Sequence, residues 1–205
     1  MNRTQIYQTV TQIIFLALFI VLILTGKTQL WMVVFIISAV ATLLLGRFYC
    51  GWLCPINTVM KLTTKLKKKL GKESLAVPKI LKKPVFRYGM LGTLMLILVL
   101  MMSSGKKLPI LPLLFAVGVS LTVFFPENLW HRYLCPYGAI LNFFGAKAKK
   151  YPEINRAVCI ECGICGKVCP GGAIIKTDRY FINKGLCLIC LECAYQCPKE
   201  AIHYN

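Results

Sequence analysis

Apolar residues gather in four long stretches of the chain, at residues 6–24, 30–45, 85–102 and 108–125. The first is unbroken from Ile13 onward, and the fourth carries Pro109 and Pro112 near its start. A helix that crosses a bilayer needs ~20 mostly apolar residues, with a range of about 17–25. The pattern therefore predicts four transmembrane helices, which Arg47 and Arg87 would extend by reaching to the lipid interface.

Two other interpretations of these stretches are weaker. Buried core helices of a soluble protein are disfavoured because the chain has four such stretches. A cleaved signal peptide is disfavoured for the first one, because only Arg3 stands before it as a basic residue and no small-x-small cleavage site follows Leu24. We therefore expect the first stretch to be an uncleaved span.

The basic residues predict how these spans are oriented. Residues 46–84 carry ten Lys and Arg side chains against the single acidic residue Glu73. The turn after the first stretch has only Lys27, and the turn after the third has Lys106 and Lys107. By the positive-inside rule, the basic middle loop lies in the cytoplasm. Four spans then place both termini there as well, in the inner or cytoplasmic membrane.

Composition supports this division of the chain. The 205 residues carry a net charge of +18, and 57% of them are hydrophobic. Residues 1–150 hold 19 basic and 2 acidic side chains, whereas residues 151–205 hold 6 and 5. The excess charge thus belongs to the predicted membrane part, where topology and anionic lipid headgroups explain it better than a nucleic-acid partner does. The hydrophobic content also excludes disorder.

The membrane part repeats itself weakly. A shift of 81 residues aligns Trp52-Leu-Cys-Pro55 with Tyr133-Leu-Cys-Pro136. Pro fits the first turn of a helix, so a helix is expected after each Cys-Pro pair. The first would be amphipathic, with an apolar face at Val59, Leu62, Leu66 and Leu70 and a basic face at Lys61, Lys65, Lys68 and Lys72. We predict that residues 1–150 form a four-span pseudo-repeat bundle with two amphipathic helices in the headgroup plane.

Residues 151–205 carry the strongest motif, the spacing C-x2-C-x2-C-x3-C-P, twice over. This doubled array is the bacterial pattern for two 4Fe–4S clusters, in which the fourth Cys of each array ligates the other cluster. One predicted ligand set is therefore Cys159, Cys162, Cys165 and Cys197. The other is Cys187, Cys190, Cys193 and Cys169. The segment is predicted to be an α+β two-cluster ferredoxin domain.

Disulfides and zinc are the alternatives for these eight cysteines. Disulfides suit oxidising compartments, whereas this segment is expected in the cytoplasm. Structural zinc sites usually combine two C-x2-C elements, and they need neither a third Cys at the same spacing nor a following Cys-Pro. Iron–sulfur clusters account for the whole pattern.

A second, smaller set of metal-binding side chains lies at the predicted membrane face: Cys50, Cys54, Cys135 and His131. If the two repeats pack face to face, the four would converge and could ligate an additional iron or iron–sulfur centre, or zinc. The alternative is a corner motif with buried thiols and no metal. A redox pair of Cys50 and Cys54 is a third option.

With these motifs together, the chain resembles the membrane-bound polyferredoxins of the NapH type and the C-terminal half of the NosR-type proteins. The resemblance rests on Cys50-Gly-Trp-Leu-Cys-Pro55, on Tyr133-Leu-Cys-Pro136 with the following Tyr-Gly-Ala, and on the two arrays. It implies an inner-membrane protein with cytoplasmic clusters that passes electrons between the quinol pool or a ferredoxin-like donor and a partner redox protein. The family has Cys-x3-Cys-Pro in both repeats, and here His131 replaces the first Cys of the second motif.

The function expected is that of an electron-transfer subunit of a membrane oxidoreductase complex, with lipid and redox proteins as partners and quinol as a candidate substrate. No catalytic residues are predicted, because a hydrolytic triad would have to draw on His131 or His203, the two histidines of the sequence. No nucleotide-binding glycine motif is found either. The alternative is an accessory or regulatory membrane ferredoxin that supports maturation of a partner metalloenzyme. A transporter is disfavoured, because the stretches lack intramembrane charges.

Overall fold

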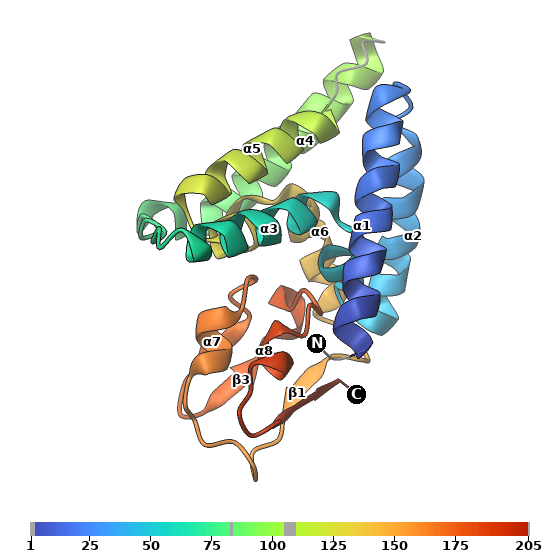
Figure 1. Cartoon of the computed structure of the whole chain (residues 1–205). Coiled ribbons are helices and arrows are strands. Elements are labelled where there is room, and N and C mark those ends of the chain that lie inside the picture. Colours follow the sequence, from blue (N-terminus) through green and yellow to red (C-terminus); the bar gives the residue numbers. More distant parts are fainter. Residues whose placement is uncertain (1–2, 83, 105–109, 205) are drawn as a thin grey trace. The chain divides into compact units, whose positions relative to one another are not determined.

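A computed structural model describes residues 3–82, 84–104 and 110–204 of the chain (Figure 1). Lys83, Lys106 and Lys107 of the predicted loops, and Leu108 and Pro109 of the fourth stretch, lie outside the described residues. The chain divides into two compact units. Unit 1 comprises Met1–Val33 and Cys54–Ala139, and unit 2 comprises Val34–Leu53 and Ile140–Asn205. Unit 2 therefore joins most of the second apolar stretch to the C-terminal segment, whereas the predicted sequence domains meet at residue 150.

The four apolar stretches form four α-helices. These are α1 (Arg3–Leu24), α2 (Leu30–Leu45), α4 (Pro84–Ser104) and α5 (Ile110–Phe124). By length and composition α1 is long enough to cross a membrane, whereas the apolar parts Leu30–Leu45, Val85–Ile97 and Ile110–Phe124, as far as the structure describes them, are shorter. The described residues thus contain one candidate span, and the four-span bundle stays a prediction.

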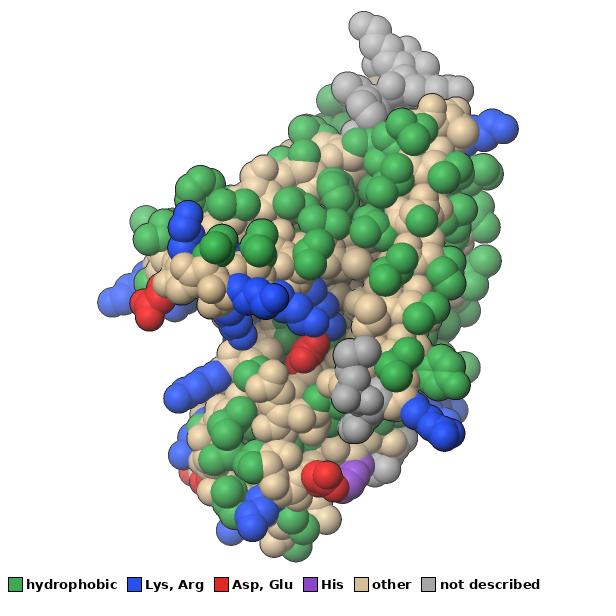
Figure 2. All heavy atoms as spheres, viewed as in Figure 1, with side chains coloured by type: hydrophobic (Ala, Val, Ile, Leu, Met, Phe, Trp, Pro, Cys, Tyr) green, Lys and Arg blue, Asp and Glu red, His purple; other side chains and the backbone are tan. Residues whose placement is uncertain are grey.

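Large apolar side chains of these helices are exposed. On α1, Ile13, Ile14 and Leu24 are 58%, 58% and 80% exposed, and α2 exposes Ile37 and Val40 in the same way. Figure 2 shows hydrophobic side chains over α1 and α5, whereas Lys and Arg side chains gather along α3. Contiguous apolar surface of this kind normally contacts lipid or another protein.

Unit 1 has its core where α3 (Pro55–Lys69) packs on α5 and α1. Ile56 and Met60 of α3 are buried with Leu114 and Trp130, and a Cβ on Gly118 would lie 3.0 Å from the Trp130 ring. The face expected at the lipid headgroups, with Leu62, Leu66 and Leu70, is exposed. The core is filled instead from another side of the helix, on which Ile56 and Met60 are buried together with Asn57 and Lys67.

The two Cys-Pro corners have the same backbone geometry. Each follows a short π-helical segment, η1 (Tyr49–Leu53) or η3 (Leu129–Leu134), and each opens a helix, α3 or α6 (Pro136–Gly145). The backbone dihedrals of Cys54 are φ −71° and ψ 116°, and those of Cys135 are −69° and 112°. The weak sequence repeat therefore corresponds to a repeated local structure.

The C-terminal segment is built from two copies of one small motif, offset by 28 residues. The first copy contains β1 (Pro152–Ile154), α7 (Ile164–Val168) and β2 (Ile174–Lys176), and the second contains β3 (Tyr180–Ile182), α8 (Glu192–Tyr195) and β4 (Ile202–Tyr204). Strand β1 pairs antiparallel with β4, and β2 pairs antiparallel with β3. Each strand pair therefore joins one strand of the first copy to one strand of the second, so each copy completes the other.

Candidate iron–sulfur sites

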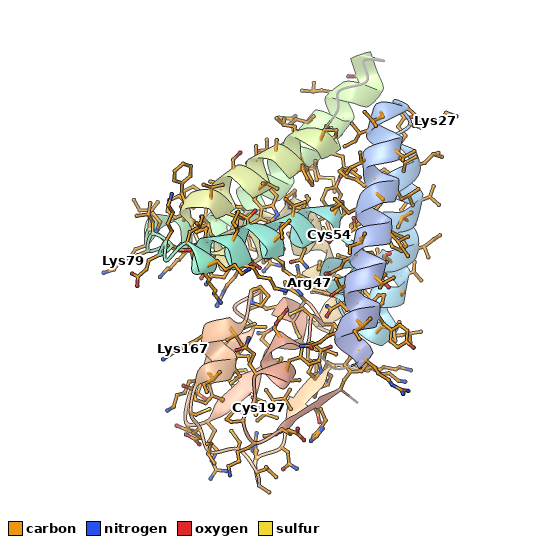
Figure 3. The ribbon with its side chains drawn as sticks, in the orientation of Figure 1. Lys27, Arg47, Cys54, Lys79, Lys167 and Cys197 are labelled. Atoms are coloured by element: carbon orange, nitrogen blue, oxygen red, sulfur yellow. The ribbon has the colours of Figure 1, made fainter. Side chains whose placement is uncertain are left out.

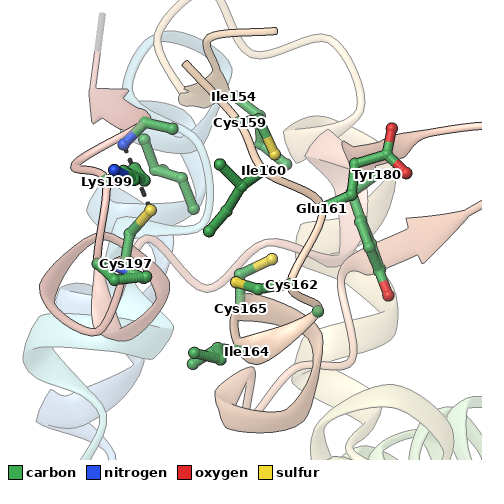
Figure 4. Close-up of a pocket in the computed structure, with 14 residues that line it drawn as sticks. Ile154, Cys159, Ile160, Glu161, Cys162, Ile164, Cys165, Tyr180, Cys197 and Lys199 are labelled. Atoms are coloured by element: carbon green, nitrogen blue, oxygen red, sulfur yellow. Dashed lines mark hydrogen bonds between the residues drawn. The ribbon is translucent and has the colours of Figure 1, made fainter.

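One pocket gathers the first predicted ligand set. Its lining includes Cys159, Cys162 and Cys165 from the first array together with Cys197, which lies at the end of the second (Figure 4). Ile154, Ile160, Ile164 and Ile202 supply apolar walls. The structure thus brings a remote cysteine to three local ones, as cluster binding across two arrays requires.

The second set gathers in the same unit. Cys187 and Cys193 are buried in one hydrophobic cluster with Ala173, Ile182 and Leu186, and Cys169 packs against that cluster. Burial raises the pKa of Cys193 above its ordinary value, and the neighbouring thiols of Cys190, Cys187 and Cys169 raise it further. These four thiols therefore lie close together in space, although Cys169 belongs to the first array and the other three to the second.

Both array loops use the left-handed backbone region at matching positions. Glu161 and Ile189 have φ of 54° and 53°, and Gly163 and Leu191 have φ of 74° and 56°. Glycine suits this position, because a Cβ on Gly163 would also meet the Tyr180 hydroxyl oxygen at 2.7 Å. Successive turns of this kind can point backbone N–H groups into one concavity, which suits a negatively charged group.

The two remote cysteines accept matching backbone hydrogen bonds. The Ala173 N–H donates to Cys169 Sγ at 3.3 Å, and the Ala201 N–H donates to Cys197 Sγ at 3.3 Å. Hydrogen bonds to the ligating sulfur are one of the ways in which a protein tunes a cluster. All eight array cysteines are free thiols, so none is diverted into a disulfide. The donor set fits 4Fe–4S clusters.

The two sites differ in their access to solvent. In the first, Cys162 is exposed and Cys159, Cys165 and Cys197 are partly exposed, whereas Cys187, Cys190 and Cys193 of the second are buried. Burial raises the pKa of the Cys187 thiol to about 12. The first site therefore lies at the surface of unit 2 and the second in its core.

A segment after α2 packs on the second array within unit 2. The Trp52 indole N–H donates to the Ile189 carbonyl oxygen at 3.1 Å. A Cβ on Gly51 would overlap the Leu188 carbonyl oxygen, so this position needs glycine. We call residues 46–52 the clamp segment, because it holds the loop that carries Cys187 and Cys190.

Arg47 belongs to the clamp segment and was expected at a lipid interface. It is instead buried, with 1% of its surface exposed. Figure 3 labels the Arg47 side chain. Its Nη1 donates to the Gly185 carbonyl oxygen at 3.2 Å, and its Nη2 donates to Cys50 Sγ at 3.6 Å. The sequence offers no spacing signal for this contact, because Arg47 and Gly185 are 138 residues apart.

The smaller predicted set divides between the two units. Cys50 belongs to unit 2, whereas Cys54, Cys135 and His131 belong to unit 1. In unit 1, burial raises the pKa of Tyr137 to about 12, and the thiols of Cys135 and Cys54 add to this rise, so both lie close to the Tyr137 hydroxyl. The convergence of all four stays a prediction.

Among the described residues, no group of three or more His, Cys, Asp and Glu side chains is close enough to hold a single metal ion. This applies to the array cysteines as well. A four-iron cluster is larger than one ion, so its ligands stand farther apart than those of a zinc site.

Comparison with known proteins gives the class. A family described as a 4Fe-4S binding domain matches residues 28–73 and 108–152, and a second one of the same description matches residues 152–175. The first two segments contain the Cys-Pro corners, and the third contains the first array. The fold and the sites thus define a ferredoxin-type iron–sulfur protein.

Individual relatives agree with this class. The chain is 32% identical over 151 residues to the ferredoxin-type protein NapH of Haemophilus influenzae. The aligned residues make up 64% of this chain and 50% of NapH. It is 28% identical over 152 residues to the methylamine utilization ferredoxin-type protein MauN of Paracoccus denitrificans, covering 63% and 50%. It is 27% identical over 200 residues to the uncharacterized protein MJ0750 of Methanocaldococcus jannaschii, covering 83% and 84%.

These matches confirm the resemblance to NapH-type polyferredoxins. The chain spans about half the length of NapH and of MauN. No solved structure matches the chain.

Proposed function

We propose that this protein is a membrane-anchored iron–sulfur protein that relays electrons between the quinol pool or a ferredoxin-like donor and a partner redox protein. The observation that carries the proposal is the pocket in which Cys197 joins Cys159, Cys162 and Cys165. A 4Fe–4S cluster bound there supplies one-electron chemistry. The second set of Cys187, Cys190, Cys193 and Cys169 would hold a second cluster.

The difference in solvent exposure between the two sites indicates which of them meets the partner redox protein. The surface site has Ile160 at its rim, 56% exposed, beside Cys162. A redox partner can approach this rim closely, and electron transfer falls steeply with distance. The buried site is shielded from such partners and exchanges electrons through the protein. The first site is therefore the proposed contact point with the partner redox protein.

The exposed apolar helices support the membrane anchor. We propose that α1, α2, α4 and α5 cross the inner membrane and that the basic loop after α2, both termini and the ferredoxin segment are cytoplasmic. The exposed Leu62, Leu66 and Leu70 of α3 alternate with lysines, which suits a helix in the headgroup plane. Unit 1 would then work as part of a membrane complex.

Reduction of the full-length protein in liposomes tests this proposal. The clusters should be reduced, as followed by the bleaching of their visible absorbance, when menaquinol or a reduced ferredoxin is added. The matched control is the variant C162A/C190A, which keeps the membrane helices and removes one ligand from each site. A wild-type protein that carries clusters but takes electrons from neither donor would contradict the proposal.

A further inference from the structure

Arg47 is a cation whose side chain is buried in unit 2. Its guanidinium binds the Gly185 carbonyl oxygen and Cys50 Sγ, and among the residues that the structure describes it forms no ion pair with Asp or Glu. Gly145 makes room for the side chain, since a Cβ there would lie 3.0 Å from Arg47 Cγ. Burying a charge is costly unless an opposite charge and hydrogen bonds compensate it.

The second ligand set lies beside this buried cation. Gly185 stands two residues before Cys187, so the bond from Arg47 places the guanidinium beside the second array. The clamp segment that carries Arg47 also approaches the second array directly, since a Cβ on Gly51 would lie 3.1 Å from the Cys190 nitrogen. Arg47 therefore lies beside the backbone that carries the second ligand set.

We propose that Arg47 is the counter-ion of the second cluster and raises its reduction potential. This inference rests on the proposed function. Four thiolates around a four-iron core give a net negative charge, and reduction adds one more. Burial alone disfavours the more highly charged reduced form, and hence lowers the potential. A buried guanidinium stabilises the reduced form more than the oxidised one, and little water is present to screen it.

The first site offers a matched contrast. Arg179 lies beside the first array, with its Nε 3.9 Å from a carboxylate oxygen of Glu161, but its side chain is 66% exposed. Its charge is both paired and screened by solvent, so it contributes little. The two arginines therefore differ in burial and pairing while each lies beside one array.

The test is an anaerobic EPR potentiometric titration of the full-length protein and three variants, with iron content measured on each sample. In R47M one of the two reduction potentials should fall by at least about 59 mV. For a one-electron couple this corresponds to a tenfold lower ratio of reduced to oxidised cluster at a fixed potential. R47K keeps the charge and should retain most of the wild-type potential. R179M should change neither potential.

Three outcomes would overturn the inference. They are a fully loaded R47M protein with both potentials unchanged, an R47K protein that falls as far as R47M, and an R179M protein that falls equally. If R47M does not retain its second cluster, R47Q takes its place, because glutamine is neutral and can still donate to the Gly185 carbonyl oxygen. Failure of the proposed function is distinct, because wild-type clusters would then titrate by EPR but would accept electrons from neither menaquinol nor a reduced ferredoxin.

Discussion

At the scale of single residues, the arrays show which positions are set by chemistry and which by backbone geometry. The cysteines follow from their spacing, and the structure gathers them into two groups that each take one member from the other array. The left-handed residues between them repeat across the arrays even where the side chain changes, as Gly163 and Leu191 show. The left-handed conformation costs a non-glycine residue roughly 1–2 kcal/mol, so other interactions of the folded loop must offset this cost.

The crossed ligand sets make a prediction at this scale. C162A and C197A should each remove the same cluster, so the double variant C162A/C197A should keep about four irons per chain. The double variant C190A/C197A should keep none, because it removes a ligand from each cluster. Iron and acid-labile sulfide analysis measures both. Complete loss in C162A/C197A with about four irons kept in C190A/C197A would show that the sets are not crossed.

At the scale of elements, the clamp segment is the feature that a sequence pattern could not give. Spacing motifs report on ligands that lie near one another in the chain, and they identified both arrays and both Cys-Pro corners. The contacts of Arg47 with Gly185 and of Trp52 with Ile189 join residues 138 and 137 positions apart, so they exist only in the folded chain. The buried side of α3 is also set by packing, because it includes Asn57 and Lys67 beside Ile56 and Met60 and so has no apolar pattern in the sequence.

The close approach of Gly51 to the second array gives a prediction for this element. In G51A the new Cβ would overlap the Leu188 carbonyl oxygen and lie 3.1 Å from the Cys190 nitrogen. Forcing atoms into a packed contact typically costs about 1–3 kcal/mol. The variant should therefore lose its cluster absorbance at a lower temperature than the wild type does.

Gly89 of α4 is the matched control. A Cβ there meets nothing within 4 Å, and alanine in a helix interior is favoured over glycine by roughly 0.5–1 kcal/mol. G89A should keep its absorbance to the wild-type temperature or above. Equal behaviour of the two variants in this thermal scan would mean that the clamp segment does not support the second site.

At the scale of the whole molecule, sequence and structure agree on an iron–sulfur protein with a helical part rich in exposed apolar side chains. The ferredoxin segment was predictable because its cysteine spacing is tied to cluster geometry. The division into compact units was not predictable, because residues 34–53 join the C-terminal segment through long-range contacts that leave no local pattern in the sequence. The number of spans rests on apolar length, and α1 alone of the described helices meets that criterion.

The central claim is that eight cysteines hold two 4Fe–4S clusters. It is tested most directly by iron and acid-labile sulfide analysis with EPR on the anaerobically purified full-length protein. The account predicts about eight irons and as many sulfides per chain, with the signal of reduced 4Fe–4S clusters after dithionite. Fewer than about four irons per chain, with zinc in their place, would contradict it.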